Sequence, residues 1–133
     1  MRPDVIELRI PSKAEWVSVA RLAIAGVASR LDFSVEDIED LKLAVAEACT
    51  NCVQHAADRD EVRIACEISQ NEIKITVEDK GAGAVNGAQQ PPAQSGEPKV
   101  GGLGVFLIRS IMDEVTYDVR QGTKLVMTKH VRK

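Results

Sequence analysis

The chain has 133 residues, of which 44% are hydrophobic and 28% are charged, and its formal net charge is −3. This composition is ordinary for a globular protein and argues against a general binder of nucleic acid or of membrane surfaces. No apolar run approaches the roughly 20 residues of a membrane span, and the N-terminal segment lacks the apolar core of a signal peptide. We therefore expect a single cytoplasmic domain over residues 1–133.

The first part of the chain predicts one strand and two helices. Hydrophobic residues alternate over residues 5–10, which indicates a half-buried strand. Residues 12–15 have the spacing of a capping box, so a helix should start there. The face that this helix should bury consists of Val19, Leu22, Ala23 and Val27. Residues 34–37 predict a second cap, which opens a longer helix. The core positions of that helix recur every three or four residues: Ile38, Leu41, Val45, Ala48 and Cys52.

Two alternating runs, residues 62–68 and 73–77, predict a β-hairpin. Asp79 lies on the same face as the buried residues of the second run, so its carboxylate should point toward the core. A buried carboxylate is costly unless other groups donate hydrogen bonds to it. Gly81 and Gly83 follow this acid, and glycine is used where the backbone turns sharply or lies against a ligand. The end of the hairpin is therefore a candidate binding position.

The rest of the chain predicts a long loop, a helix and two strands. Residues 84–100 are rich in Gly, Pro, Gln and Ala and have no apolar period, as in a lid or a disordered loop. The glycines of residues 101–104 should precede a helix, whose N-terminal N–H groups can bind an anion. Strands are expected around residues 115–119 and 125–127. This order predicts an α+β fold: a two-layer sandwich whose mixed, mainly antiparallel sheet is covered on one face by helices.

The three cysteines raise the alternative of metal or redox chemistry. Cys49 and Cys52 form a C-x-x-C pair, but no second pair follows and the chain has only two histidines. A structural zinc site normally needs four ligands. A redox pair of the thioredoxin type lies where a strand meets a helix, whereas this pair lies within a helical pattern. We therefore interpret these cysteines, together with Cys66, as small buried residues.

Glu47, Asn51 and His55 follow one another at intervals of four, so they form a stripe along one helix, displaced from its core positions. An exposed helix often carries Glu and Asn without any function. Asn51 can nevertheless supply a hard oxygen ligand for Mg²⁺, which binds through few protein groups and through phosphates. Glu47 can orient or deprotonate a hydroxyl group that attacks phosphorus.

Taken in order, these motifs resemble those of the GHKL ATPases. The motifs are E-x-x-x-N-x-x-x-H-A at 47–56, D-x-G-x-G at 79–83, G-L-G at 102–104, and Gly122-Thr123 before the last strand. Within that superfamily, the chain is most similar to the anti-sigma factor serine/threonine kinases of the RsbW and SpoIIAB type, over nearly its whole length. The resemblance implies the Bergerat sandwich fold, ATP and Mg²⁺ as cofactors, and an ATP lid at residues 84–100.

The resemblance also implies a role for each matching residue. Glu47 would be the catalytic base and Asn51 the Mg²⁺ ligand, whereas Asp79 would accept a hydrogen bond from the adenine amino group. The remaining nucleotide contacts would be Gly81, Gly83, Gly102, Gly104 and Thr123. Lys99, the only basic residue of the lid segment, is our candidate for the γ-phosphate, and Arg21 would contact protein partners.

From these residues we expect an anti-sigma factor that is also a protein kinase. It would bind a sigma factor and phosphorylate an anti-anti-sigma protein of the STAS type, and it would form a homodimer without binding nucleic acid or membranes directly. Two alternatives remain open at this point. One is an ATP-gated binding module without kinase activity, and the other is a switch kinase of a stressosome-like pathway.

Overall fold

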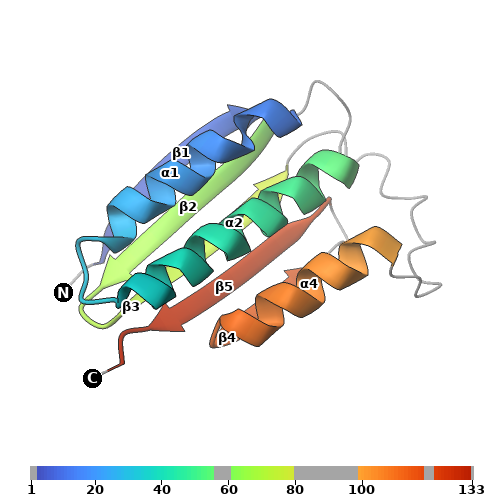
Figure 1. Ribbon diagram of the computed structural model, residues 1–133. Coiled ribbons are helices and arrows are strands. Elements are labelled where there is room, and N and C mark those ends of the chain that lie inside the picture. Colours follow the sequence, from blue (N-terminus) through green and yellow to red (C-terminus); the bar gives the residue numbers. More distant parts are fainter. Residues whose placement is uncertain (1–2, 56–60, 80–98, 119–121, 133) are drawn as a thin grey trace.

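The computed structural model describes residues 3–55, 61–79, 99–118 and 122–132 (Figure 1). The helices and strands in these ranges follow the predicted order. They are β1 (Asp4–Pro11), the short 3₁₀ helix η1 (Ala14–Trp16), α1 (Val17–Ala28), α2 (Val35–His55), β2 (Glu61–Ser69), β3 (Glu72–Asp79), α4 (Lys99–Ile111), β4 (Glu114–Asp118) and β5 (Lys124–His130).

The strands form one sheet in the order β1-β2-β3-β5-β4, and every neighbouring pair among the described strands is antiparallel. The β2–β3 hairpin is confirmed, because Ser69 pairs with Glu72 across its short turn. Since β5 lies between β3 and β4, the residues that enter β5 lie beside the end of β3, where Glu78 pairs with Lys124. This topology brings two segments that are distant in sequence to the same corner of the sheet.

The helices α1, α2 and α4 lie side by side over one face of the sheet, with α2 in the middle (Figure 1). The predicted two-layer α+β arrangement is therefore confirmed. Apolar side chains fill the space between the layers, and their removal from water is the main favourable term in folding. The largest fully buried side chains include Ile24, Leu41, Ile73, Ile75, Ile108, Leu125 and Met127. No helix of the described residues is long and apolar enough to cross a membrane.

The face of α1 that packs on the core differs from the predicted one. Val19 and Leu22 are exposed, with 39% and 67% of their surface accessible. The buried positions are instead Ala20, Ile24 and Ala28. Because α1 is apolar on nearly every side, its periodicity cannot select a face by itself. The small alanine side chains suit the close packing of α1 on α2, and this packing selects the face.

Of the two predicted helix caps, one is confirmed and one is wrong. The backbone N–H of Asp37 donates to Ser34 Oγ at 3.0 Å, which caps the start of α2. Ser12, in contrast, does not cap a helix. A 3₁₀ turn begins after Lys13 without a side-chain cap, and the buried Ser12 hydroxyl has no hydrogen-bond partner among the described residues. The same sequence spacing thus occurs with and without the capping bond.

The helix α4 begins at Lys99, earlier than predicted. The glycines of residues 101–104 consequently lie within the helix and do not precede it. The prediction placed its start after Gly104 because glycine has no side chain and so adds nothing to a hydrophobic pattern. Residues 84–98 of the predicted lid lie outside the described residues, and residues 99–100 belong to α4.

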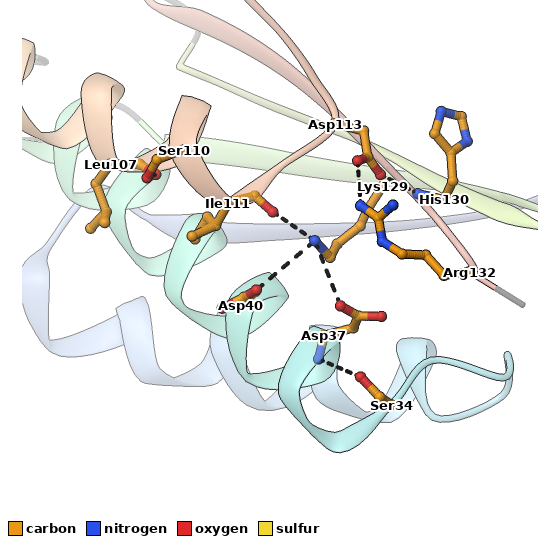
Figure 2. Close-up of polar contacts among 10 residues, drawn as sticks. All are labelled: Ser34, Asp37, Asp40, Leu107, Ser110, Ile111, Asp113, Lys129, His130 and Arg132. Carbon is orange, nitrogen blue, oxygen red and sulfur yellow. Dashed lines mark hydrogen bonds and ion pairs between the residues drawn. The ribbon is translucent and has the colours of Figure 1, made fainter.

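Lys129 of β5 links two helices at one end of the molecule (Figure 2). Its Nζ donates a hydrogen bond to the carbonyl oxygen of Ile111, the last residue of α4, at 2.6 Å. It also lies 3.8 Å from Asp37 Oδ1 and 3.9 Å from Asp40 Oδ2, near the start of α2. A cation at a helix C-terminus and anions at a helix N-terminus both interact favourably with the helix dipoles. This buried lysine therefore fastens the C-terminal end of α4 to α2.

Replacement of this lysine should destabilise the fold. Lys129→Met keeps most of the side-chain length but leaves the Ile111 carbonyl without its donor, and the two aspartates lose their shared cation. An unsatisfied buried acceptor costs about 1–3 kcal/mol, so we expect urea denaturation to show a free energy of unfolding lower by that amount. Lys124→Met, at an exposed position of the same strand, should change it by less than about 0.5 kcal/mol. Equal effects of the two substitutions would contradict this role of Lys129.

Candidate functional site

The helix α2 carries a buried apolar face and a polar edge that faces α4. Ala44, Ala48 and Cys52 are completely buried, whereas Glu47 is half-buried. Asn51 lies one turn after Glu47 and only 3% of its surface is exposed. Glu47 and Asn51 of the predicted polar stripe therefore do not lie on a solvated surface: they lie where α2 meets its neighbours.

Asn51 is a buried amide without a regular hydrogen bond. Neither Oδ1 nor Nδ2 forms one with any described residue. Burial raises the pKa of the Tyr117 hydroxyl, and the nearby Asn51 side chain offsets part of this rise. Nearly all buried polar groups in native proteins are hydrogen-bonded, so an amide of this kind calls for a further partner. A hard, buried amide oxygen fits a Mg²⁺ ion that completes its coordination with phosphates and water.

Asp79 ends β3 with its carboxylate on the buried face, as the strand period predicted, and 3% of the residue is exposed. Its backbone N–H donates to the carbonyl oxygen of Thr123 at 3.1 Å. The backbone N–H of Thr123 lies 3.4 Å from Asp79 Oδ2, a long hydrogen bond. The sheet topology thus brings together two of the predicted site residues, both of them buried.

Gly122 makes this approach possible. Its φ of +95° lies in the region that only glycine adopts at little cost. A Cβ atom at this position would lie 3.0 Å from Asp79 Oδ1 and 3.3 Å from the Asp79 carbonyl oxygen. Gly122 therefore lies closely against the end of β3. From the sequence, Gly122 was placed in a family motif before the last strand, and its contact with the carboxylate depends on the strand order.

The end of α2 lies over this corner of the sheet. Burial raises the pKa of the Cys52 thiol, and the nearby Asp79 carboxylate raises it further. Burial also raises the pKa of Cys49 to about 12 and that of Cys66 to about 11. All three cysteines are buried, so their interpretation as buried residues is confirmed.

The predicted site residues fall into four groups. Glu47, Asn51, Asp79, Gly104 and Thr123 come from α2, β3, α4 and the start of β5, and their elements meet in one region (Figure 1). Lys99 and Gly102 belong to the first turns of α4, whereas Gly81 and Gly83 lie outside the described residues. Arg21 is exposed on α1, which is separated from α4 by α2.

Tyr117 was missed as a site residue. The alternation of residues 115–119 marked it as a strand residue, and nothing in that pattern connects β4 with Asn51. The connection arises because β4 lies at the edge of the sheet beneath the helices, with Tyr117 paired to Leu125 of β5. The half-buried phenol is consequently the polar group of β4 that approaches Asn51.

Known proteins match this chain in sequence and in fold. Residues 10–129 match the family described as the histidine kinase-like ATPase domain. The serine-protein kinase RsbW of Staphylococcus aureus (strain MSSA476) is 41% identical over 99% of this chain and 90% of its own length. The serine-protein kinase RsbW of Halalkalibacterium halodurans is 38% identical over 99% of this chain and 86% of its own length.

A solved structure agrees with this match at the level of the fold. The crystal structure of the RsbU and RsbW domains of Rv1364c from Mycobacterium tuberculosis superposes on 98% of this chain with a TM-score of 0.71 and 15% sequence identity. The present chain covers 33% of that longer chain. The fold and the sequence match together define a histidine kinase-like ATPase domain. Within this class, the chain belongs to the family of the RsbW serine-protein kinases.

The contact between Gly122 and Asp79 can be tested by substitution. Gly122→Ala forces a Cβ into a left-handed conformation, which costs about 1–2 kcal/mol, and presses it against the carboxylate. We expect a free energy of unfolding lower by at least that amount in urea denaturation. Gly26→Ala is the matched control, because a Cβ there meets nothing within 4 Å and alanine favours the helix by about 1 kcal/mol. A Gly122→Ala protein as stable as the wild type would rule out this close approach.

Proposed function

We propose that this chain transfers the γ-phosphoryl group of Mg-ATP to a serine or threonine of an anti-anti-sigma partner of the STAS type, and that it also binds a sigma factor. One observation carries the proposal: the buried Asn51 amide, which has no regular hydrogen bond, lies one helical turn from Glu47 and near the corner that holds Asp79. Membership of the RsbW kinase family supports the use of ATP and the type of reaction.

In this proposal Asp79 recognises the adenine base of ATP. The carboxylate is held at the end of β3 by the turn at Gly122 and Thr123, and its burial excludes most competing water. An ionised carboxylate can accept hydrogen bonds but cannot donate them. Adenine presents an amino group at the position where guanine presents a carbonyl. Asp79 therefore favours ATP over GTP.

Asn51 would hold the metal ion through its amide oxygen. When bound there, Mg²⁺ would supply positive charge that stabilises the negative charge developing on the transferred phosphoryl group. The amide contributes a neutral ligand, so most of the remaining coordination is left to phosphates and water, as is usual for this ion.

Glu47 would act on the partner hydroxyl. Its carboxylate accepts the proton of the serine or threonine hydroxyl as the oxygen attacks the γ-phosphorus, and ADP leaves. Glu47 lies half-buried against α4 and one helical turn before Asn51, so in this proposal its carboxylate would be near the metal-bound phosphates and accessible to a partner. This division of work assigns binding of the base to Asp79 and chemistry to Glu47.

Two substitutions should separate these roles. Asp79→Asn can place a donor against the adenine amino group, and an unsatisfied buried group costs about 1–3 kcal/mol, so the ATP affinity should fall at least about fivefold. Glu47→Gln should keep ATP binding within about threefold but lower phosphotransfer about 100-fold, the scale of a positioned general base. Calorimetric titration with ATP and transfer of labelled phosphate to the partner measure the two effects.

Glu39→Gln is the matched control, because Glu39 is exposed on the same helix and forms a surface ion pair with Lys42. Glu39→Gln should change neither the ATP affinity nor the rate of phosphotransfer. Normal phosphotransfer by Glu47→Gln would refute the role of Glu47 as a base. If the wild type binds ATP and its partner but transfers no phosphate, the ATP-gated binding module is the better description.

The partner surface is a separate proposal. Arg21 is exposed on α1, away from the nucleotide residues, so a partner can reach it without blocking the site. Arg21→Glu should weaken the binding of the sigma factor or of the anti-anti-sigma partner by about tenfold, as for a reversed charge in a contact, with unchanged ATP affinity. Arg30→Glu, also exposed but beyond the end of α1, should have no such effect. Equal partner affinities of the Arg21→Glu and Arg30→Glu variants would remove Arg21 from the interface with the partner.

We also expect a homodimer.

A further inference from the structure

Gly104 lies in the interior of α4, where glycine is an unfavourable choice. Glycine is a poorer helix former than any residue except proline. The backbone does not require it, because among the described glycines only Gly122 has a positive φ. The helix continues regularly through position 104 to Ile111. The reason for a glycine here must therefore lie in what surrounds it.

The surroundings of Gly104 contain the carboxylate of Glu47. A Cβ atom at position 104 would lie 3.0 Å from Glu47 Oε1, closer than almost all real contacts of a Cβ. The helices α2 and α4 lie side by side (Figure 1). The missing side chain at position 104 lets the carboxylate approach the surface of α4 directly. At Gly26, the glycine in α1, a Cβ would meet nothing within 4 Å. Of the two helical glycines Gly26 and Gly104, only Gly104 therefore has such a contact.

We infer that Gly104 is a positioning residue for Glu47: the absence of a side chain at 104 keeps open the place that the Glu47 carboxylate occupies. This inference rests on the proposed role of Glu47 as the proton acceptor. It is separate from any contact between this glycine and phosphates, which the family resemblance implies. A contact with phosphates concerns nucleotide affinity, whereas clearance for Glu47 concerns the step in which the partner hydroxyl loses its proton.

An alanine at 104 would displace the carboxylate and leave the helix in place. The atom in contact is the end of a flexible side chain, so it can shift by a few tenths of an ångström at a cost that is measurable but small against the stability of the fold. Alanine also favours the helical conformation more than glycine does. Catalysis is sensitive to such shifts, since a misplacement of about 1 Å can lower a rate about 100-fold. Gly104→Ala should therefore give a stable protein that transfers phosphate more slowly.

The contact itself can be measured without any kinase assay. In a double-mutant cycle, Gly104→Ala and Glu47→Ala are compared singly and together by urea denaturation. In the Glu47→Ala background, Gly104→Ala should raise the denaturation midpoint as much as Gly26→Ala does. In the wild-type background the increase should be smaller or reversed, whereas Gly26→Ala should act equally in both. The same increase for Gly104→Ala in both backgrounds would overturn the inference.

The kinetic part compares kcat with the KM for ATP. We expect Gly104→Ala to lower kcat about tenfold with an unchanged KM, and to have no further effect on the residual rate of Glu47→Gln. A higher KM at constant kcat, or the same fall in both backgrounds, would show that the glycine serves the phosphates and would overturn the inference. If the wild type transfers no phosphate, the proposed function fails, and the denaturation cycle still decides whether Gly104 makes room for Glu47.

Discussion

The packing of α2 between α1, α4 and the sheet is the constraint on which the arrangement of the site depends. The helix has to bury an apolar face made largely of small residues, among them Ala44 and Ala48, and this face sets its rotation about its own axis. Once that rotation is set, Asn51 is directed into the interior and Glu47 toward α4. Two polar residues thereby acquire their positions largely from apolar packing.

The helix α4 is held differently at its two ends. Its C-terminal end is tied to α2 and β5 by the buried amine of Lys129 (Figure 2). Nearer its start, Gly104 faces Glu47 without an intervening side chain. A helix that is anchored at one end and packed closely through a glycine nearer the other can adjust at the site while the anchored end stays unchanged. The buried carboxylate of Asp79 is also unfavourable for stability, because an apolar residue at this position would stabilise the fold more.

The parts of the fold that follow from local periodicity could be predicted from the sequence. The period of two gave the β2–β3 hairpin and the inward direction of Asp79, and the period of three to four gave the core of α2. The start of α4 could not be predicted, since glycines leave no pattern. The face of α1 depends on packing against α2, because nearly all sides of that helix are apolar. The approach of Tyr117 to Asn51 and of Gly122 to Asp79 requires the strand order, which no local signal contains. The roles of the site residues came from the family motifs and remain proposals.

The burial of the thiols has a practical consequence for spectroscopy. All three cysteines of the chain are buried, and their raised pKa values keep them protonated at neutral pH, whereas maleimide and iodoacetamide reagents react with thiolates. A cysteine introduced at an exposed position would therefore be the reactive thiol of the folded protein. A fluorophore or spin label could be attached to the outer surface of α1 or α4 while the natural cysteines, and the core that they help to fill, stay intact.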